Sequence, residues 1–141
     1  MNSIKQFMTE SAHAVGHDQT LKFAHDRMQQ FGLQHLPVLD GGVLVGVLSD
    51  RDIALISAVS PEQLETTAAE EAMSADPYSV SPTDDVATVT AHMTQHKHRS
   101  AVVMDHNKVV GLFTATDALA LLSRLLELRE LAPALAKLTK K

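Results

Sequence analysis

The sequence of 141 residues contains no cysteine and no tryptophan, with one tyrosine and four phenylalanines. Without cysteine the chain has no disulfide bond, thiolate metal site or cysteine nucleophile, as is common for proteins of a reducing compartment. No apolar run approaches the roughly 18 residues of a membrane-spanning helix, and the N-terminal residues lack the apolar segment of a secretory signal. These absences predict a soluble cytoplasmic protein with no membrane partner.

An excess of positive charge is also missing, since 12 Lys and Arg residues stand against 17 Asp and Glu residues and the net charge is −5. Such a chain has no overall electrostatic attraction for nucleic acid, although a local basic pocket remains compatible with this charge. Its length suits one compact domain and is too short for a catalytic domain plus a regulatory one. A regulatory role would therefore act on another polypeptide.

What the sequence does contain is one pattern that occurs twice, 65 residues apart and without a gap. Residues 46–52 (GVLSDRD) return as residues 111–117 (GLFTATD), and nine of the 49 pairs between 8–56 and 73–121 are identical. A fixed internal period makes half of the chain the building block. Each half is too small to bury a good core alone, so we expect the two halves to pack face to face.

The hydrophobic pattern predicts a strand, a helix, two strands and a helix in each half. In the first half the helix has its apolar positions between Leu21 and Phe31, with Asp18 as candidate N-cap and Gly32 just past its end. Apolar runs at 36–39 and 43–48 flank an Asp-Gly-Gly turn, and their nearly continuous hydrophobicity is typical of strands buried on both faces. A second helix begins near Ser49.

The second half repeats this plan, with strands near 78–80, 101–104 and 109–113 and helices at 83–96 and from 114 onward. The sequence therefore predicts an α/β fold with a first repeat at 1–59 and a second at 73–124. Residues 60–72, with Pro61 and several Glu and Thr residues, form the connector between them and hold a short helix. Residues 125–141 form a C-terminal helical tail.

The last helix outlasts its counterpart in the first half. Its apolar residues alternate at spacings of three and four: Ala118, Leu121, Leu125, Leu128, Ala132 and Leu135. Such a narrow seam is typical of helix pairing, although Pro133 should kink or interrupt the helix. Two interpretations stay open, since the seam could pack on its own domain or form a dimer contact.

The repeated motif G-x-x-[S/T]-x-x-D places a glycine at a strand end, a hydroxyl at a helix start and a carboxylate one turn later. The pattern has a purely structural interpretation, because Ser or Thr followed three residues later by an acid resembles a capping box. In the functional interpretation the helix N-terminus binds a phosphate, the carboxylate accepts the hydroxyls of a ribose, and the glycine lets the ligand approach the backbone.

With these residues in view, the chain resembles a tandem pair of cystathionine β-synthase (CBS) domains. The resemblance rests on residues 35–40 (HLPVLD) with 46–52, and on 100–105 (SAVVMD) with 111–117. Met8-Thr9 and Met73-Ser74 open each repeat as the family's repeats usually open. The similarity spans residues 4 to about 124, and only the C-terminal tail lies outside it.

This resemblance implies two βαββα repeats about a pseudo-twofold axis, with clefts for adenosine-containing ligands such as AMP, ADP, ATP, S-adenosylmethionine or dinucleotides. In the family the motif aspartate holds the ribose, the hydroxyl contacts ribose or phosphate, and residues before the middle strand face the phosphates. The corresponding positions are Asp52 and Asp117, Ser49 and Thr114, then Gln34 and His35 in the first repeat and Arg99 and Ser100 in the second. Arg51 is a further cation, and Thr116 stands in its place in the second motif, so the two clefts should differ.

Eight histidines raise the question of a metal site, and His92 and His96 lie one helical turn apart. A third ligand is needed, and none is obviously placed to supply it, so we predict no metal. Together with Lys97, His98 and Arg99, this pair could instead form a positive patch near the second cleft. The sequence contains no Ser-His-Asp set, P-loop lysine or nucleophile elbow, so we predict no catalytic residues and no enzymatic activity.

The leading hypothesis is a regulatory sensor that binds an adenine nucleotide and signals through the geometry of a homodimer or through an effector protein of unknown identity. It has no obligatory cofactor. The alternative is a ligand-independent scaffold that uses the same fold to dimerise and dock.

Overall fold

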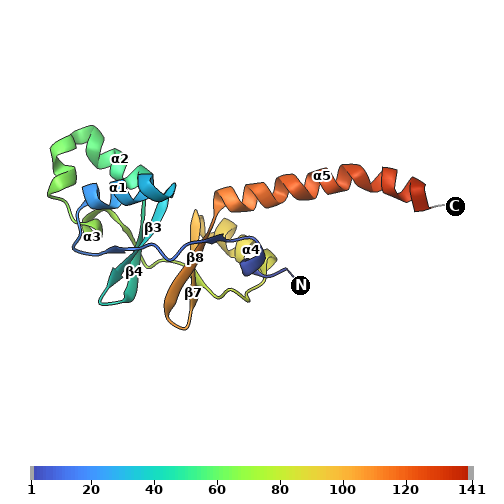
Figure 1. Ribbon diagram of the computed structural model, residues 1–141, viewed down its shortest axis with the longest axis horizontal. Coiled ribbons are helices and arrows are strands. Elements are labelled where there is room, and N and C mark those ends of the chain that lie inside the picture. The colour runs from blue at the N-terminus through green and yellow to red at the C-terminus, as the bar shows by residue number, and fades with distance from the viewer. Residues whose placement is uncertain (1, 140–141) are drawn as a thin grey trace.

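The structure is a computed structural model that describes residues 2–139, so Lys140 and Lys141 at the end of the expected tail lie outside the described residues, as do the side chains of Leu135 and Thr139. The described chain forms two four-stranded sheets that stand side by side, with a long helix projecting from the second (Figure 1). The strand orders are β2-β3-β4-β5 and β1-β8-β7-β6.

Each half contains the expected succession of a strand, a helix, two strands and a helix. In the first half these elements are β2 (Val15–Gly16), α1 (Leu21–Phe31), β3 (His35–Asp40), β4 (Val43–Ser49) and α2 (Asp50–Val59). In the second half they are β6 (Ser79–Val80), α4 (Val86–His96), β7 (Ser100–Asp105), β8 (Lys108–Thr114) and α5 (Ala115–Thr139). The predicted mixed α/β fold is therefore confirmed, and the connector holds the expected short helical segments.

Each sheet is completed by a strand from the opening of the other repeat, which the sequence did not predict. The opening segments are η1 (Ile4–Gln6) and β1 (Thr9–Glu10), and, after η2 (Pro61–Glu65), α3 (Ala69–Ala72) and β5 (Ser74–Ala75). β1 pairs antiparallel with β8, and β5 pairs antiparallel with β4. The sequence does not show this exchange, because strands of two residues leave no periodicity to read.

The repeated glycines make this exchange possible. A Cβ at Gly46 would contact the Met73 side chain and lie 2.8 Å from the carbonyl oxygen of Ser74, and a Cβ at Gly111 would lie 2.7 Å from the carbonyl oxygen of Thr9. Any side chain would therefore push the exchanged strand away. The glycine of the motif admits a neighbouring backbone, which corrects our expectation that it admits a ligand.

Three hydrophobic clusters form the core, and they explain the nearly continuous apolar runs. Alternate residues of β3, such as Leu36 and Val38, face the helices of the first repeat. Ala101 and Val103 of β7 do the same in the second repeat. Residues on the opposite faces of the two sheets turn to the space between the sheets. There Val47 of β4, Val102 of β7 and Leu112 of β8 form the third cluster. The two halves thus pack face to face, as predicted.

The helix ends follow local capping rules, with one difference from the prediction. The N-cap of α1 is Thr20, whose Oγ1 accepts the backbone N–H of Phe23 at 3.1 Å, and not Asp18. Gly32 ends α1 at φ +66°, as predicted. Lys97 occupies the same position after α4 at φ +57°, a left-handed conformation that is unfavourable for a residue other than glycine.

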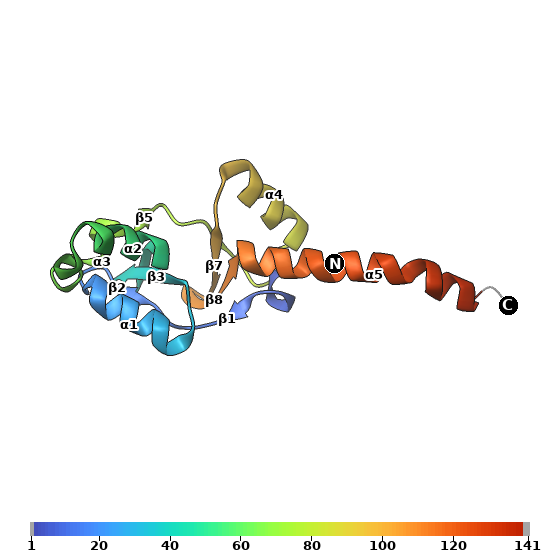
Figure 2. The same ribbon diagram turned by 90° about the horizontal axis from the view of Figure 1, so that it is seen from above.

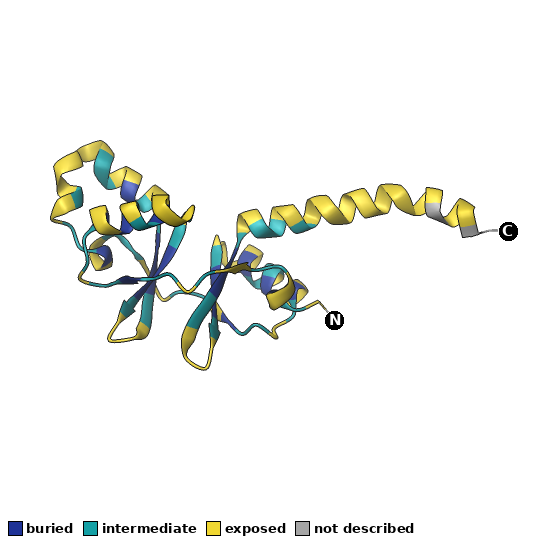
Figure 3. Cartoon of the chain, viewed as in Figure 1, coloured by how far each residue is buried: buried dark blue, intermediate teal, exposed yellow. Residues whose placement is uncertain are grey.

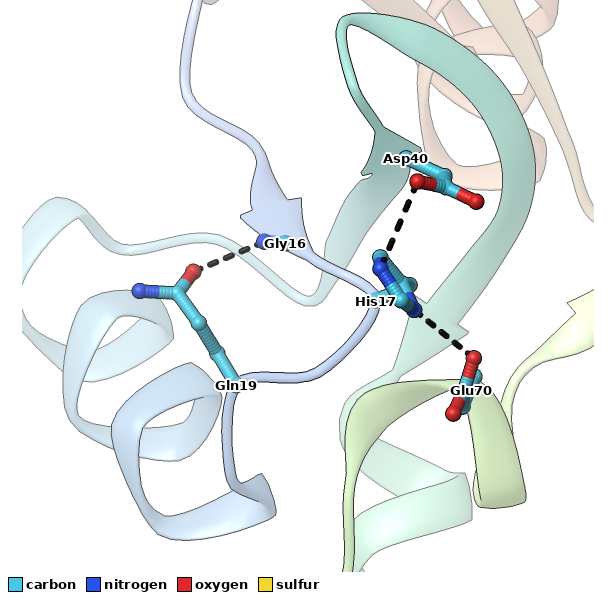
Figure 4. A network of polar contacts seen from close by, with 5 residues as sticks. All are labelled: Gly16, His17, Gln19, Asp40 and Glu70. Carbon is cyan, nitrogen blue, oxygen red and sulfur yellow. Dashed lines mark hydrogen bonds and ion pairs between the residues drawn. The ribbon is translucent and has the colours of Figure 1, made fainter.

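His17, which directly follows β2, contacts a residue of β3 and a residue of α3 (Figure 4). The Nδ1 atom of His17 lies 2.8 Å from Oε2 of Glu70 on α3, and its Nε2 atom lies 3.4 Å from Oδ1 of Asp40 at the end of β3. The hydrogen bond with Glu70, followed by the charge of Asp40, raises the pKa of His17 above its ordinary value. Protonated His17 therefore ties the segment before β5 to the sheet that β5 completes.

The helix α5 begins on the second sheet and then leaves the molecule (Figures 1 and 2). Ala118 and Leu121 pack against the core of the second repeat, whereas the leucines of the later turns whose side chains are described are at least half exposed (Figure 3). The helix is continuous through Pro133, so the expected interruption is absent, although Figure 1 shows its axis curving over. Within residues 2–139 no helix combines the length and the apolar character that crossing a membrane requires.

Candidate functional site

Both motifs form the capping box that the structural interpretation predicted. The Oγ of Ser49 accepts the backbone N–H of Asp52 at 3.1 Å, and Oδ2 of Asp52 accepts the backbone N–H of Ser49 at 2.9 Å. In the second motif Thr114 and Asp117 make the same two bonds at 3.2 and 2.9 Å. The two interpretations of the motif are therefore compatible only if a ligand uses atoms that the cap leaves available.

The capping leaves little of the helix N-terminus for a phosphate. Besides the two capped N–H groups of α2, the N–H of Asp50 donates to the carbonyl oxygen of Gln34 at 2.9 Å. The N–H of Ala115, at the start of α5, donates to the carbonyl oxygen of Arg99 at 2.9 Å. Three of the first four N–H groups of each helix thus have partners within the chain. The expectation that the helix N-terminus binds a phosphate stays a prediction, and most of the donors to a phosphate here would have to be side chains.

The two motif carboxylates differ in what else holds them. Oδ1 of Asp117 accepts the hydroxyl of Thr9 from the exchanged strand β1 at 3.0 Å, and its Oδ2 accepts the hydroxyl of Thr114 at 3.1 Å. The hydrogen bonds described for Asp52 involve its Oδ2 and its backbone N–H, both shared with Ser49. Donors of the chain itself therefore engage both oxygens of Asp117.

The first cleft lies beside the first motif and has a volume of about 390 Å³. Ser49, Arg51 and Asp52 line it from the first repeat. Opposite them stand residues that precede β7 or begin it, namely Lys97, His98, Arg99 and Ser100. Ser74, Ala75, Asp76, Pro77 and Tyr78, from the opening of the second repeat, and His35 and Val47 complete the wall. Three lysine or arginine side chains thus face two carboxylates in this cleft.

The second cleft lies beside the second motif and is smaller, at about 260 Å³. It is lined by Thr114, Thr116 and Asp117 together with Thr9, Leu112, Gly32, Leu33, Gln34 and His35. Gly32, Leu33 and Gln34 stand where Lys97, His98 and Arg99 stand in the first cleft, 65 residues apart. No lysine or arginine is among the lining residues of the second cleft.

Each cleft therefore combines the motif of one repeat with the residues before the middle strand of the other. Arg99 and Ser100 of the second repeat line the cleft of the first motif, and Gln34 of the first repeat lines that of the second, whereas His35 lines both. The positive patch of Lys97, His98 and Arg99 likewise lies at the first cleft and not at the second. The crossing follows from the face-to-face packing, because the two sheets present their motifs across a pseudo-twofold axis. Sequence reasoning placed Lys97 near the other cleft, and it missed Tyr78 and Asp76 as lining residues.

His35 is the one predicted residue that lines both clefts. Burial lowers the pKa of its imidazole, and the neighbouring charges of Asp50, Asp52 and Asp117 only partly oppose that effect. His35 is therefore a neutral hydrogen-bonding group at neutral pH, and it adds no positive charge to either cleft.

The histidines of α4 form a stack of rings behind the first cleft. The ring centroid of His92 lies 4.0 Å from that of Tyr78 and 4.0 Å from that of His96, and His98 lies 5.5 Å from Tyr78. Partial burial, then the proximity of His96 and His98, lowers the pKa of His92. Within the described residues, no group of three or more histidine or acidic side chains is arranged to hold a metal ion.

Comparison with known proteins identifies the family. The family model described as CBS domain matches the chain twice, at residues 4–58 and 69–124. The CBS domain-containing protein YhcV of Bacillus subtilis is 33% identical over 117 residues, which cover 83% of each chain. The chain therefore belongs to the CBS domain family and contains a tandem pair of these domains.

Solved structures of CBS pairs have the same fold. The CBS domain pair of protein MJ0100, solved in complex with 5′-methylthioadenosine and S-adenosyl-L-methionine, superposes with a TM-score of 0.72 at 22% identity and covers 87% of this chain and 97% of that one. CBSX2 in complex with AMP gives a TM-score of 0.69 at 21% identity, covering 89% and 98%. At these identities the likeness establishes the fold of the pair.

Proposed function

We propose that this CBS pair is a regulatory module that binds an adenosine-containing ligand between its two repeats and signals the bound state through a homodimer or a partner protein. One observation carries the proposal. A carboxylate suited to a ribose, that of Asp52, lines the same cleft as the cationic side chains of Arg51 and Arg99. AMP, ADP, ATP, S-adenosylmethionine and dinucleotides all contain the ribose that this carboxylate would accept.

In the proposed complex Asp52 accepts the ribose hydroxyls, because a carboxylate can accept two hydrogen bonds from a vicinal diol. Ser49 stays in its capping box and orients Asp52. Arg51 and Arg99 donate to phosphate oxygens, and Ser100 adds a hydroxyl at the start of β7. Tyr78 supplies an aromatic ring to the cleft wall for the adenine. The names of the MJ0100 and CBSX2 complexes support a ligand of this class.

Because the cleft draws its walls from both repeats, a ligand in it contacts both halves at once. Binding can then favour one arrangement of the repeats over another, provided that the ligand has a different affinity for the two arrangements. This requirement links ligand binding to a signal without any chemical step. In this proposal the protein is therefore a binding module and not an enzyme.

The signal needs a surface, and the distal part of α5 supplies one. Leu122, Leu125, Leu126, Leu128, Leu131 and Leu138 are 50 to 75% exposed. We assign this surface to the α5 of a second copy, because its charged residues have both signs, with Arg124 and Arg129 close to Glu127 and Glu130. A bilayer would have to accept all four charges, whereas a second helix can pair them.

Light scattering on the full chain tests this assignment. The expected mass is about twice 15.3 kDa, falling to the monomer in Leu125→Glu. Leu55→Glu, at a leucine of α2 that is 64% exposed, is the matched control and should leave the dimer intact. A monomeric parent chain, or a dimer that is lost in the control and not in Leu125→Glu, would contradict the assignment.

A second candidate function is the ligand-independent scaffold, favoured by the same exposed leucines of α5. A thermal-shift panel of AMP, ADP, ATP, S-adenosylmethionine, NAD and cyclic dinucleotides separates the two functions. The sensor predicts that at least one compound raises the melting temperature of the parent chain and raises it less in Asp52→Asn. A folded protein that responds to none of the panel would leave the scaffold as the function.

A further inference from the structure

We infer that the two clefts of this chain are unequal, so that the first takes a 5′-phosphorylated adenosine compound and the second takes no phosphorylated ligand. The inference rests on the proposed function and specifies the ligand class and the number of sites. It depends on two differences between pseudo-equivalent positions of the two repeats, and on one feature that both clefts share.

The first difference is the charge of the lining. Arg51, Lys97 and Arg99 bring three cations to the first cleft, and the equivalent positions of the second cleft hold Thr116, Gly32 and Gln34. A phosphate carries one or two negative charges and is strongly hydrated, so leaving water for a site without cations is unfavourable. Asp117 leaves the second cleft with a negative charge, whereas in the first cleft the three cations outnumber the carboxylates of Asp52 and Asp76.

The helix N-termini are in the same state in both clefts, and this state rules out the usual substitute for cations. In each cleft the capping box and a backbone bond already use three of the first four N–H groups. The helix end therefore offers each phosphate at most a minor contribution. Side chains therefore have to discriminate between phosphorylated and unphosphorylated ligands. Cationic side chains line the first cleft, and none is among the described residues that line the second.

The second difference is the availability of the carboxylate. The hydroxyl of Thr9 lies 3.0 Å from Oδ1 of Asp117, so a ribose would have to displace a bond that also fixes the strand β1. The residue equivalent to Thr9 is Ser74, and the hydrogen bonds described for Asp52 are those with Ser49. The volume of about 260 Å³ against 390 Å³ gives the second cleft less room as well.

Calorimetric titration of the full chain with AMP and with adenosine tests the inference. We expect one AMP per chain, bound about 10-fold or more tightly than adenosine, because charged hydrogen bonds to the phosphate are lost in the nucleoside. Arg99→Gln, which installs the residue of the second cleft, should weaken AMP about 10-fold and leave adenosine unchanged. Lys22→Gln removes a cation from an exposed ion pair on α1 and is the matched control.

The possible failures are distinguishable. Equal affinities for AMP and adenosine, two AMP molecules bound alike, or an unchanged AMP affinity in Arg99→Gln would each overturn the inference while leaving the proposed function standing. A chain that binds neither compound, nor any other member of the adenosine panel, would overturn both.

Discussion

The two clefts of this protein are formed by equivalent segments of the two repeats but are lined by side chains of different charge. Each has a motif at a helix start, a strand from the opening of a repeat and a short segment before a middle strand. The scaffold residues agree between the copies, as Gly46 agrees with Gly111 and Asp52 with Asp117. The residues that would contact a phosphate differ between the copies, since Arg51 and Arg99 correspond to Thr116 and Gln34. The repeated residues therefore hold the fold, and the unrepeated ones distinguish the sites.

The largest expected difference in AMP affinity is between variants of the two motif carboxylates. Asp52→Asn keeps an oxygen for the capping box and removes the charge, so AMP affinity should fall about 10- to 100-fold. Asp117→Asn makes the same change in the second cleft and should alter AMP affinity less than about 2-fold. Titration calorimetry on both variants checks the pair. Equal losses in the two would mean that both clefts bind.

Substitutions of the two motif glycines test a feature that both repeats share, which is the close contact of the glycine with the exchanged strand. Gly46→Ala and Gly111→Ala should each lower the free energy of unfolding by about 1–3 kcal/mol, because a Cβ at either position collides with the exchanged strand. Urea denaturation measures the loss. Gly16→Ala is the control, since its Cβ would meet its neighbours at an ordinary 3.4 Å. Glycine variants as stable as this control would mean that the exchanged strands are not in place.

Arg51 offers a finer test of the difference between the clefts. Arg51→Thr copies the second motif into the first and should weaken AMP several-fold, about 1 kcal/mol, because one charged donor to the phosphate is lost. Adenosine affinity should stay unchanged, since the ribose carboxylate is retained. A loss of equal size for AMP and adenosine would indicate that Arg51 supports the fold of the cleft and not the phosphate.

The smallest expected effect distinguishes the repeats by pH. The pKa of His17 is raised in the folded chain, so the contact of its protonated ring with Glu70 and Asp40 stabilises the fold below its ordinary pKa of 6.5. That contribution disappears as the pH rises through the higher folded-state pKa. The second repeat has Pro82 in its place and lacks this dependence.

Urea denaturation of His17→Gln at several pH values makes this visible. The variant should be less stable than the parent at about pH 5.5 and should approach it at about pH 8.5. Gln30→Ala, at an exposed position of α1 without a titratable side chain, should shift stability equally at all pH values. A constant difference for His17→Gln would show that the imidazolium has no special role in joining α3 to the first sheet.

Much of this architecture could be predicted because long elements have clear periods. The strands β3 and β7 alternate between the helix face and the sheet interface, and the sequence shows that double burial as nearly unbroken hydrophobicity. The strand exchange could not be predicted, since β1 and β5 have two residues each. It also hid the role of Gly46, whose neighbour Ser74 is 28 positions away.

The structure places the motif residues beside two clefts, and their role in binding stays a prediction. Reading the repeats along the chain did not show that Arg99 and Ser100 of the second repeat lie across from Ser49 of the first. The sequence contains no signal for that crossing, because it arises when two sheets meet in three dimensions. The repeat boundaries, the ligand and the dimer remain predictions.

The central claim is that a phosphorylated adenosine compound occupies the cleft of Asp52 and leaves that of Asp117 empty. A crystal structure of the full chain grown with AMP tests it most directly. We predict one AMP per chain, with its ribose hydroxyls on Asp52 and its phosphate between Arg51 and Arg99. Density for AMP against Asp117, or equally in both clefts, would contradict the account.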